Sequence, residues 1–181
     1  MNTIDAIKSR RTIRKFTQEP VTDDELMTII DAGRLAAFGA NKQPLKFKIL
    51  RNAAEIYPCT KWAGYLTDWE PAENERPTCY IAILGDTGIK KTFETEAGSA
   101  IANMMLAAVD LGLGTCWLGA LDRKKLTEII DTDMEVVYLL AVGRPAQNCK
   151  AVDIVGDDVK YFEDQNGTIY VPKRTMSEVL V

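Results

Sequence analysis

The longest predicted element, a helix from about Thr92 to Leu111, constrains the fold most strongly because it is apolar on most sides. A helix of this kind belongs in the core of a globular protein. A membrane span is disfavoured, because Asn103, Asp110 and three glycines interrupt the longest apolar stretch of the sequence, residues 100–121. Gly112 follows the last apolar turn, where a glycine commonly ends a helix. We therefore expect one main core with this helix buried in it.

Two further helices have clear signals. Thr22 and Glu25 fit a capping box that opens an amphipathic helix from about Asp23 to Ala36, and a shorter helix is expected around Ile4–Lys8. A third helix, residues 123–131, can be capped by Asp122.

Strand patterns alternate with these helices. Short apolar or alternating runs predict strands at residues 46–50, 79–86, 115–119 and 135–143. Residues 159–171 predict a hairpin that turns at Asn166 and Gly167. The chain has no internal repeat and no low-complexity linker. This order predicts a single mixed helix and strand domain over residues 1–181.

Composition excludes several kinds of chemistry. The chain of 181 residues contains no histidine, which removes Ser-His and Cys-His nucleophiles and histidine metal ligands. Its four cysteines form no C-x-x-C pair, so neither a zinc site nor a redox dithiol is indicated, and we expect buried free thiols. The first residues do not resemble a secretory signal, and a cytoplasmic protein without a membrane partner is expected.

The segment SRRTIRKF, residues 9–16, places four cations in a chain whose formal net charge is −4. From composition alone, a solvated surface patch is the simpler interpretation. The alternative is a phosphate clamp, in which Arg10 and Arg11 form bidentate bonds to phosphate oxygens and Thr12 adds a hydroxyl donor. The acidic balance of the whole chain, with a pI near 5.0, disfavours a nucleic-acid partner.

Three segments together resemble a known family. IDAIKSRRTIRKF, AAFGANKQPLKF and GLGTCWLGAL occur in the order and approximate spacing of the nitroreductase-like family of FMN-dependent oxidoreductases, and a basic doublet near the C-terminus adds to the match. The resemblance covers nearly the whole chain. It implies an α+β fold, with a mainly antiparallel central sheet flanked by helices, in an intertwined homodimer that binds FMN.

The resemblance also implies a phosphate site made by both ends of the chain. Arg10, Arg11 and Thr12 match the family's ribityl-phosphate positions, and Lys173 and Arg174 match its basic residues near the C-terminus. Residues near both ends of the chain would then bind the FMN phosphate.

Four residues match positions along the flavin ring. Arg14 matches a cationic position beside the pyrimidine, where positive charge favours the anionic reduced flavin. Leu118, Gly119 and Ala120 match a segment alongside the isoalloxazine that directs a backbone N–H at N5, and a glycine permits such close approach. Many relatives carry Glu at the position of Gly119. An ordinary strand end and turn is the alternative interpretation of this segment.

Residues 37–45 match a segment that reaches the flavin held mainly by the other subunit, so the site would require a homodimer. The residues implied are Phe38, Gly39, Asn41 and Gln43. The match is imperfect, because Ala37 and Phe38 stand where Pro-Ser is usual and Leu45 stands where Trp is usual. A plain turn between helix and strand is the alternative.

Residues 57–78 lack periodicity and are rich in aromatic and acidic residues, so we expect a loop excursion over the site. Trp62, Tyr65 and Trp69 are candidates for contacts with a flat acceptor. The alternative is that these rings pack beneath the loop as part of the core.

The function that the resemblance implies is transfer of hydride from NADH or NADPH, through flavin N5, to a small acceptor such as a nitroaromatic or a quinone. The lack of histidine suits this chemistry because the cofactor carries it. No G-x-G-x-x-G follows a predicted strand, so the pyridine nucleotide would be held transiently. A non-catalytic FMN-binding or storage protein is the alternative, since every motif above is a binding motif.

Overall fold

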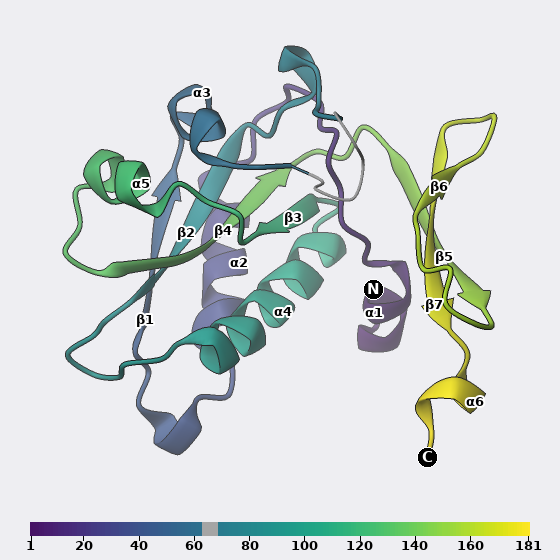
Figure 1. Ribbon diagram of the computed structural model, residues 1–181. Coiled ribbons are helices and arrows are strands. Elements are labelled where there is room, and N and C mark those ends of the chain that lie inside the picture. The colour runs from purple at the N-terminus through teal and green to yellow at the C-terminus, as the bar shows by residue number, and fades with distance from the viewer. Residues whose placement is uncertain (63–68) are drawn as a thin grey trace.

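The computed structural model describes residues 1–62 and 69–181, and a four-stranded sheet lies at its centre (Figure 1). Every neighbouring pair in this sheet is antiparallel, in the order β1-β2-β4-β3. Its strands are β1 (Leu45–Leu50), β2 (Cys79–Gly85), β3 (Gly114–Leu118) and β4 (Glu135–Gly143). The four predicted strands and the mainly antiparallel sheet are confirmed.

Helices cover both faces of this sheet. On one face α2 (Asp23–Arg34) and α4 (Glu94–Asp110) pack together over side chains such as Ile81 and Leu140. On the other face α3 (Ala53–Ile56), η2 (Tyr57–Cys59) and α5 (Arg123–Ile130) cover the alternate side chains, including Tyr80 and Leu139. Successive residues of a strand point to opposite faces of the sheet. Because helices cover both faces, every residue of β2 is buried.

Helices α2 and α4 begin and end close to the residues that the sequence predicts. Thr22 and Glu25 form the predicted capping box of α2, with reciprocal side-chain and backbone bonds. Helix α4 begins at Glu94, two residues later than expected, because Phe93 takes up a non-helical conformation and packs in the core. Gly112 has φ +73° after the end of α4, as expected of a glycine in that position.

A second, three-stranded sheet carries the C-terminal part of the chain and lies to one side of the central sheet in Figure 1. It contains β5 (Asn148–Ile154), β6 (Phe162–Glu163) and β7 (Thr168–Arg174). The β6–β7 hairpin confirms the predicted turn, with Gly167 at φ +77°. Strand β5 was not predicted, because it is half-exposed and polar and gains its strand form by parallel pairing with β7.

The remaining elements are short. Helix α1 (Thr3–Ser9) confirms the N-terminal prediction, and α6 (Met176–Val179) lies in the C-terminal tail. Two single turns complete the described elements: η1 (Gly39–Asn41) lies in the expected connection between helix and strand, and η3 (Glu73–Glu75) lies in the 57–78 excursion. No helix among the described residues has the length and apolar character needed to cross a membrane. All four cysteines are free, and three of them are buried, while Cys149 is half-buried.

Candidate functional site

The basic stretch after α1 runs along the edge of the central sheet at β3. Thr12 forms a parallel bridge with Thr115, and the N–H of Ile13 donates to the carbonyl of Thr115 at 2.9 Å. Further along, Phe16 bridges to Pro145, and the N–H of Thr17 donates to the carbonyl of Arg144 at 2.9 Å. The stretch is thus fixed as an extended segment between β3 and the residues that follow β4.

Two glycines make this close docking possible. A Cβ on Gly114 would lie 2.8 Å from the side chain of Ile13, and a Cβ on Gly143 would lie 2.7 Å from the ring of Phe16. Ile13 and Phe16 are themselves buried. The apolar residues of the stretch therefore face the core, and the polar residues between them are left half-buried at the edge.

Arg10 and Arg11 are half-buried cations, and neither forms an ion pair within residues 1–62 and 69–181. The Nε of Arg11 is buried without a hydrogen-bond partner in that same part of the chain. Burial lowers the pKa of Arg10, and the neighbouring charge of Arg11 lowers it further. Arg11 gives one donor to the carbonyl of Arg10, but its Nε finds no partner among the described residues, so these two adjacent cations fit an anion such as a phosphate.

The other cations of the stretch have different surroundings. The Nζ of Lys15 forms an ion pair with Glu75 at 3.1 Å. The guanidinium of Arg14 lies over the ring of Tyr161, with its central carbon 5.6 Å from the ring centroid. Lys15 is thus paired with a carboxylate of the chain, and Arg14 lies against an aromatic ring.

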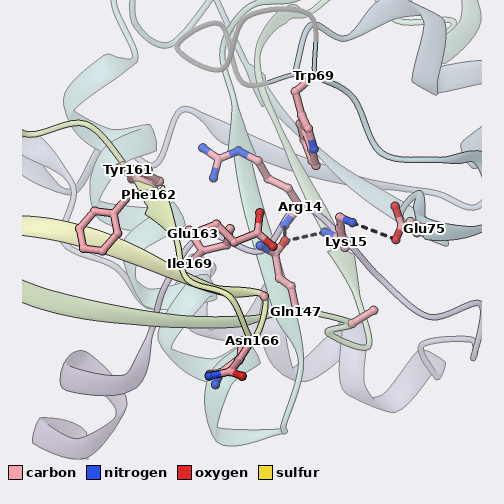
Figure 2. A pocket seen from close by; sticks show the side chains of 13 residues that line it. Arg14, Lys15, Trp69, Glu75, Gln147, Tyr161, Phe162, Glu163, Asn166 and Ile169 are labelled. Carbon is pink, nitrogen blue, oxygen red and sulfur yellow. Dashed lines mark hydrogen bonds and ion pairs between the residues drawn. The ribbon is translucent and has the colours of Figure 1, made fainter.

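Arg14 faces a cavity of about 640 Å³ between the basic stretch and the second sheet, as Figure 2 shows. This volume is in the range of small-molecule sites. Its walls combine aromatic, amide and charged side chains: Arg14, Lys15, Trp69, Glu75, Gln147, Asn148, Tyr161, Phe162, Glu163 and Asn166. Of the thirteen predicted flavin contacts, Arg14 lines this cavity.

The segment Leu118–Ala120 lies at the end of β3. Leu118 is buried opposite Leu139, while Gly119 and Ala120 are exposed. The carbonyl of Gly119 accepts from Arg123 at 3.3 Å, and that of Ala120 accepts from the N–H of Lys61 at 3.0 Å. The two carbonyls are thus used within the chain.

The segment around η1 has an unusual backbone. Ala40, Asn41 and Gln43 all have φ near +50°, a conformation that non-glycine residues seldom adopt. Such strain persists only where the surroundings impose it, and it often marks a functional segment. Asn41 and Gln43 are exposed, while Phe38 packs against the core.

A buried carboxylate lies beneath this segment. Glu96, in the first turn of α4, is 3% exposed and binds the Nζ of Lys90 at 2.5 Å. A Cβ on Gly39 would lie 3.2 Å from the carboxylate, so the backbone at Gly39 passes close to it. Bonding to Lys90 lowers the pKa of Glu96, and the backbone of Gly39 also contributes.

The C-terminal basic doublet is exposed at the end of β7. Arg174 is engaged within its own part of the chain, because it pairs with Asp157 at 2.8 Å and with Glu178 at 3.5 Å. Its guanidinium also donates to the carbonyl of Gly156 at 2.8 Å. Lys173 forms no ion pair within the residues that the structure describes.

The aromatic residues of the 57–78 excursion separate into two groups. Trp62 is buried, lies parallel to Tyr57 with ring centroids 6.0 Å apart, and donates from Nε1 to the hydroxyl of Thr60. It is therefore a core residue, in line with the alternative interpretation. Trp69 lines the cavity, and Tyr65 lies outside the described residues.

Sequence reasoning missed several cavity residues, above all Gln147, Glu75 and Tyr161. Glu75 ends the single turn η3, Tyr161 directly precedes β6, and Gln147 lies in the connection between β4 and β5. No periodicity or motif marks these positions. Only the tertiary arrangement brings them to the basic stretch.

The fold and the site together define a class: an α+β protein whose basic N-terminal stretch follows the edge of an antiparallel sheet and offers cations to a small anion. A family model described as "Putative TM nitroreductase" matches residues 2–167. The chain belongs to this nitroreductase family.

Curated relatives carry oxidoreductase names. The chain is 28% identical over 165 residues to "FMN reductase (NADPH)" of Bacillus subtilis, covering 80% of this chain and 66% of that protein. It is 25% identical over 174 residues to a "Putative NADH dehydrogenase/NAD(P)H nitroreductase" of Methanothermobacter thermautotrophicus, covering 90% and 87% respectively. The chain thus spans about two thirds of the length of the first relative and most of the second.

Solved structures share the fold. A nitroreductase from Desulfovibrio desulfuricans, described as a complex with FMN, superposes with a TM-score of 0.74 at 25% identity, covering 100% of this chain and 96% of that one. A protein from Parabacteroides distasonis, described as a "Putative NADH dehydrogenase/NAD(P)H nitroreductase", superposes with a TM-score of 0.69 at 21% identity, covering 82% of this chain and 90% of that one. The predicted α+β nitroreductase fold is confirmed.

Proposed function

We propose that the protein is an FMN-dependent oxidoreductase that takes hydride from NADH or NADPH and reduces a small acceptor, such as a nitroaromatic or a quinone. The observation that carries the proposal is the pair of half-buried cations, Arg10 and Arg11, that the family fold leaves without carboxylate partners among the described residues. Bound FMN supplies the redox chemistry, because its N5 accepts hydride and gives it up again.

The roles of the phosphate-binding residues follow from charge and position. Arg10 and Arg11 bind the phosphate of FMN, since the two cations are adjacent in the sequence and half-buried at the sheet edge. Thr12 is held beside them by its bridge to β3. Lys173 and Arg174 complete the phosphate site, and Arg174 must then exchange Asp157 for the phosphate.

The ring-binding residues are assigned by the family resemblance. Arg14 stabilises negative charge on the reduced ring, and Leu118, Gly119 and Ala120 lie along one side of it. Water supplies the proton that a quinone needs in addition to hydride. Phe38, Gly39, Asn41 and Gln43 reach the ring held by a second subunit, so the functional unit is a homodimer. The strained, exposed backbone at residues 40–43 supports this assignment.

Two further points belong to the same proposal. The four free cysteines are typical of a reducing compartment, and we place the protein in the cytoplasm. Trp69, in the wall of the cavity, is the candidate for contact with a flat acceptor.

The test is an absorption spectrum of the purified protein, from about 300 to 550 nm, before and after NADH or NADPH is added under nitrogen. Two flavin bands that bleach, followed by steady oxidation of the nucleotide when a quinone or nitro compound is added, are expected. Bands that do not bleach, or bleach once without turnover, would favour the FMN-storage alternative. A colourless protein that takes up no added FMN would refute the proposal.

A further inference from the structure

One side chain holds the backbone of the basic stretch at Arg14. The side-chain oxygen Oε1 of Gln147 accepts from the N–H of Arg14 at 2.5 Å and from the N–H of Lys15 at 2.7 Å, as Figure 2 shows. The amide nitrogen of Gln147 donates in turn to the Sγ of Cys149 at 3.3 Å. A residue more than 130 positions away thus binds two consecutive backbone groups of the stretch.

The neighbouring backbone groups use main-chain partners instead. The N–H of Ile13 donates to the carbonyl of Thr115, and the N–H of Phe16 donates to the carbonyl of Glu75 at 2.8 Å. Between Ile13 and Phe16, the N–H groups of the basic stretch donate to the side chain of Gln147 instead of to the backbone of a neighbouring strand. The orientation of Arg14, whose side chain faces the cavity, is therefore tied to Gln147, which lines the same cavity.

The amide suits this position better than a carboxylate. Its oxygen can accept two N–H bonds while remaining uncharged. A Glu at this position would accept the same bonds but would place a negative charge beside Arg14 and reduce its attraction for an anionic ring.

We propose that Gln147 is a positioning residue for the flavin: it fixes the backbone of Arg14 and so holds the guanidinium where it stabilises the reduced ring. This inference rests on the proposed function. It does not concern the phosphate site, because Gln147 contacts neither Arg10 nor Arg11 in any hydrogen bond of the described residues.

The first experiment is a double-mutant cycle on the FMN-loaded protein, with Gln147→Met, Arg14→Met and the combination. Gln147→Met should raise the Kd for FMN by about fivefold or more, as expected for loss of two hydrogen bonds, and make the flavin reduction potential more negative. In the Arg14→Met background, Gln147→Met should produce no further shift of the potential. Gln165→Met, in the exposed hairpin turn, is the matched control and should leave both quantities unchanged.

Equal shifts of the potential in both backgrounds would overturn the inference, because Gln147 would then not act through Arg14. Normal FMN affinity and potential in Gln147→Met would overturn it too, while leaving the proposed function intact. A wild-type chain that binds no FMN would overturn both.

The second experiment needs no flavin. Amide hydrogen exchange of the FMN-free protein, followed by NMR, should show faster exchange of the Arg14 and Lys15 amides in Gln147→Met. The amides of Ile13 and Phe16 should exchange as in the wild type, because their acceptors are backbone carbonyls. Unchanged exchange at Arg14 and Lys15, or equal acceleration at all four amides, would contradict a specific positioning role.

Discussion

At the scale of single residues, Glu96 shows how a buried charge makes stability depend on pH. Lys90 and nearby backbone groups lower the pKa of its carboxyl. A lowered pKa in the folded state means that the ion pair stabilises the protein above the ordinary Glu pKa, about 4.3, and that this contribution is lost as the pH falls towards the folded value. The pair therefore stabilises the protein fully at neutral pH.

Glu96→Gln should reduce the free energy of unfolding by about 1.5–3 kcal/mol at pH 7, as for loss of a bond between charged groups. The difference between wild type and variant should shrink as the pH is lowered from about 5 to 3. Urea unfolding at several pH values measures this, with Glu128→Gln on the exposed side of α5 as the control. A difference that stays constant with pH would mean that the carboxyl is not the titrating group.

Arg10 and Arg11 provide the test of the phosphate site. Replacing either by Ala should weaken FMN binding by about 1.5–3 kcal/mol, because each side chain would lose charge-assisted bonds. Isothermal titration with FMN gives the affinities, and Lys124→Ala, an exposed cation of α5, serves as the control. If both arginine variants bind FMN as the wild type does, the stretch is a surface patch after all.

At the scale of elements, the docking of the basic stretch onto β3 depends on Gly114. A methyl group at this position would meet Ile13, which cannot easily move because it is buried. Overpacking of this kind typically costs about 1–3 kcal/mol. We expect Gly114→Ala to lower the melting temperature and to weaken FMN binding, because the cations move with the stretch.

The matched control is Gly98→Ala in α4, where a methyl group would make an ordinary contact with Trp117 at 3.7 Å. Alanine favours a helix interior over glycine by about 0.5–1 kcal/mol, so this variant should be as stable as the wild type or more so. Thermal unfolding of the two variants distinguishes the positions. Equal effects at both would contradict the close contact between Gly114 and Ile13.

Elements with local signals could be predicted from the sequence, and those defined by tertiary pairing could not. The capping box of α2 and the apolar runs of α4 and β2 each lie within one short segment, so the local sequence is enough to predict these elements. Strand β5 lacks such a pattern because one parallel partner defines it, and that partner lies some twenty residues further on. The contacts of Gln147 could not be predicted for the same reason, since the backbone groups that it binds lie near the N-terminus.

At the scale of the whole molecule, the C-terminal region leaves apolar side chains in solvent. Met176, Val179 and Leu180 of the tail are each more than half exposed, and so are Ile4 of α1 and Phe162 of β6. Exposed apolar side chains of this size are often covered by a partner subunit. These residues fit the proposed homodimer, in which they would be covered.

Sedimentation equilibrium should therefore give a mass of twice the 20.1 kDa of the chain, at micromolar concentration. Met176→Glu combined with Leu180→Glu should shift the protein towards monomer and lower its FMN affinity, because the ring contacts from the second subunit are lost. Val155→Glu, an exposed apolar position outside the tail, is the comparison. A wild-type monomer that binds FMN tightly would contradict a site shared between subunits.

The seating of residues 12–17 between β3 and the connection after β4 also sets an order of events during synthesis. These residues leave the ribosome well before their partners, Thr115, Arg144 and Gln147, which are made more than a hundred residues later. Nascent chains grow at about 5–20 residues per second. Residues 12–17 are therefore exposed for at least several seconds before their hydrogen-bond partners have been synthesised. The proposed phosphate site therefore takes its final form only after residues up to Gln147 have been made, so the cofactor binds late in synthesis.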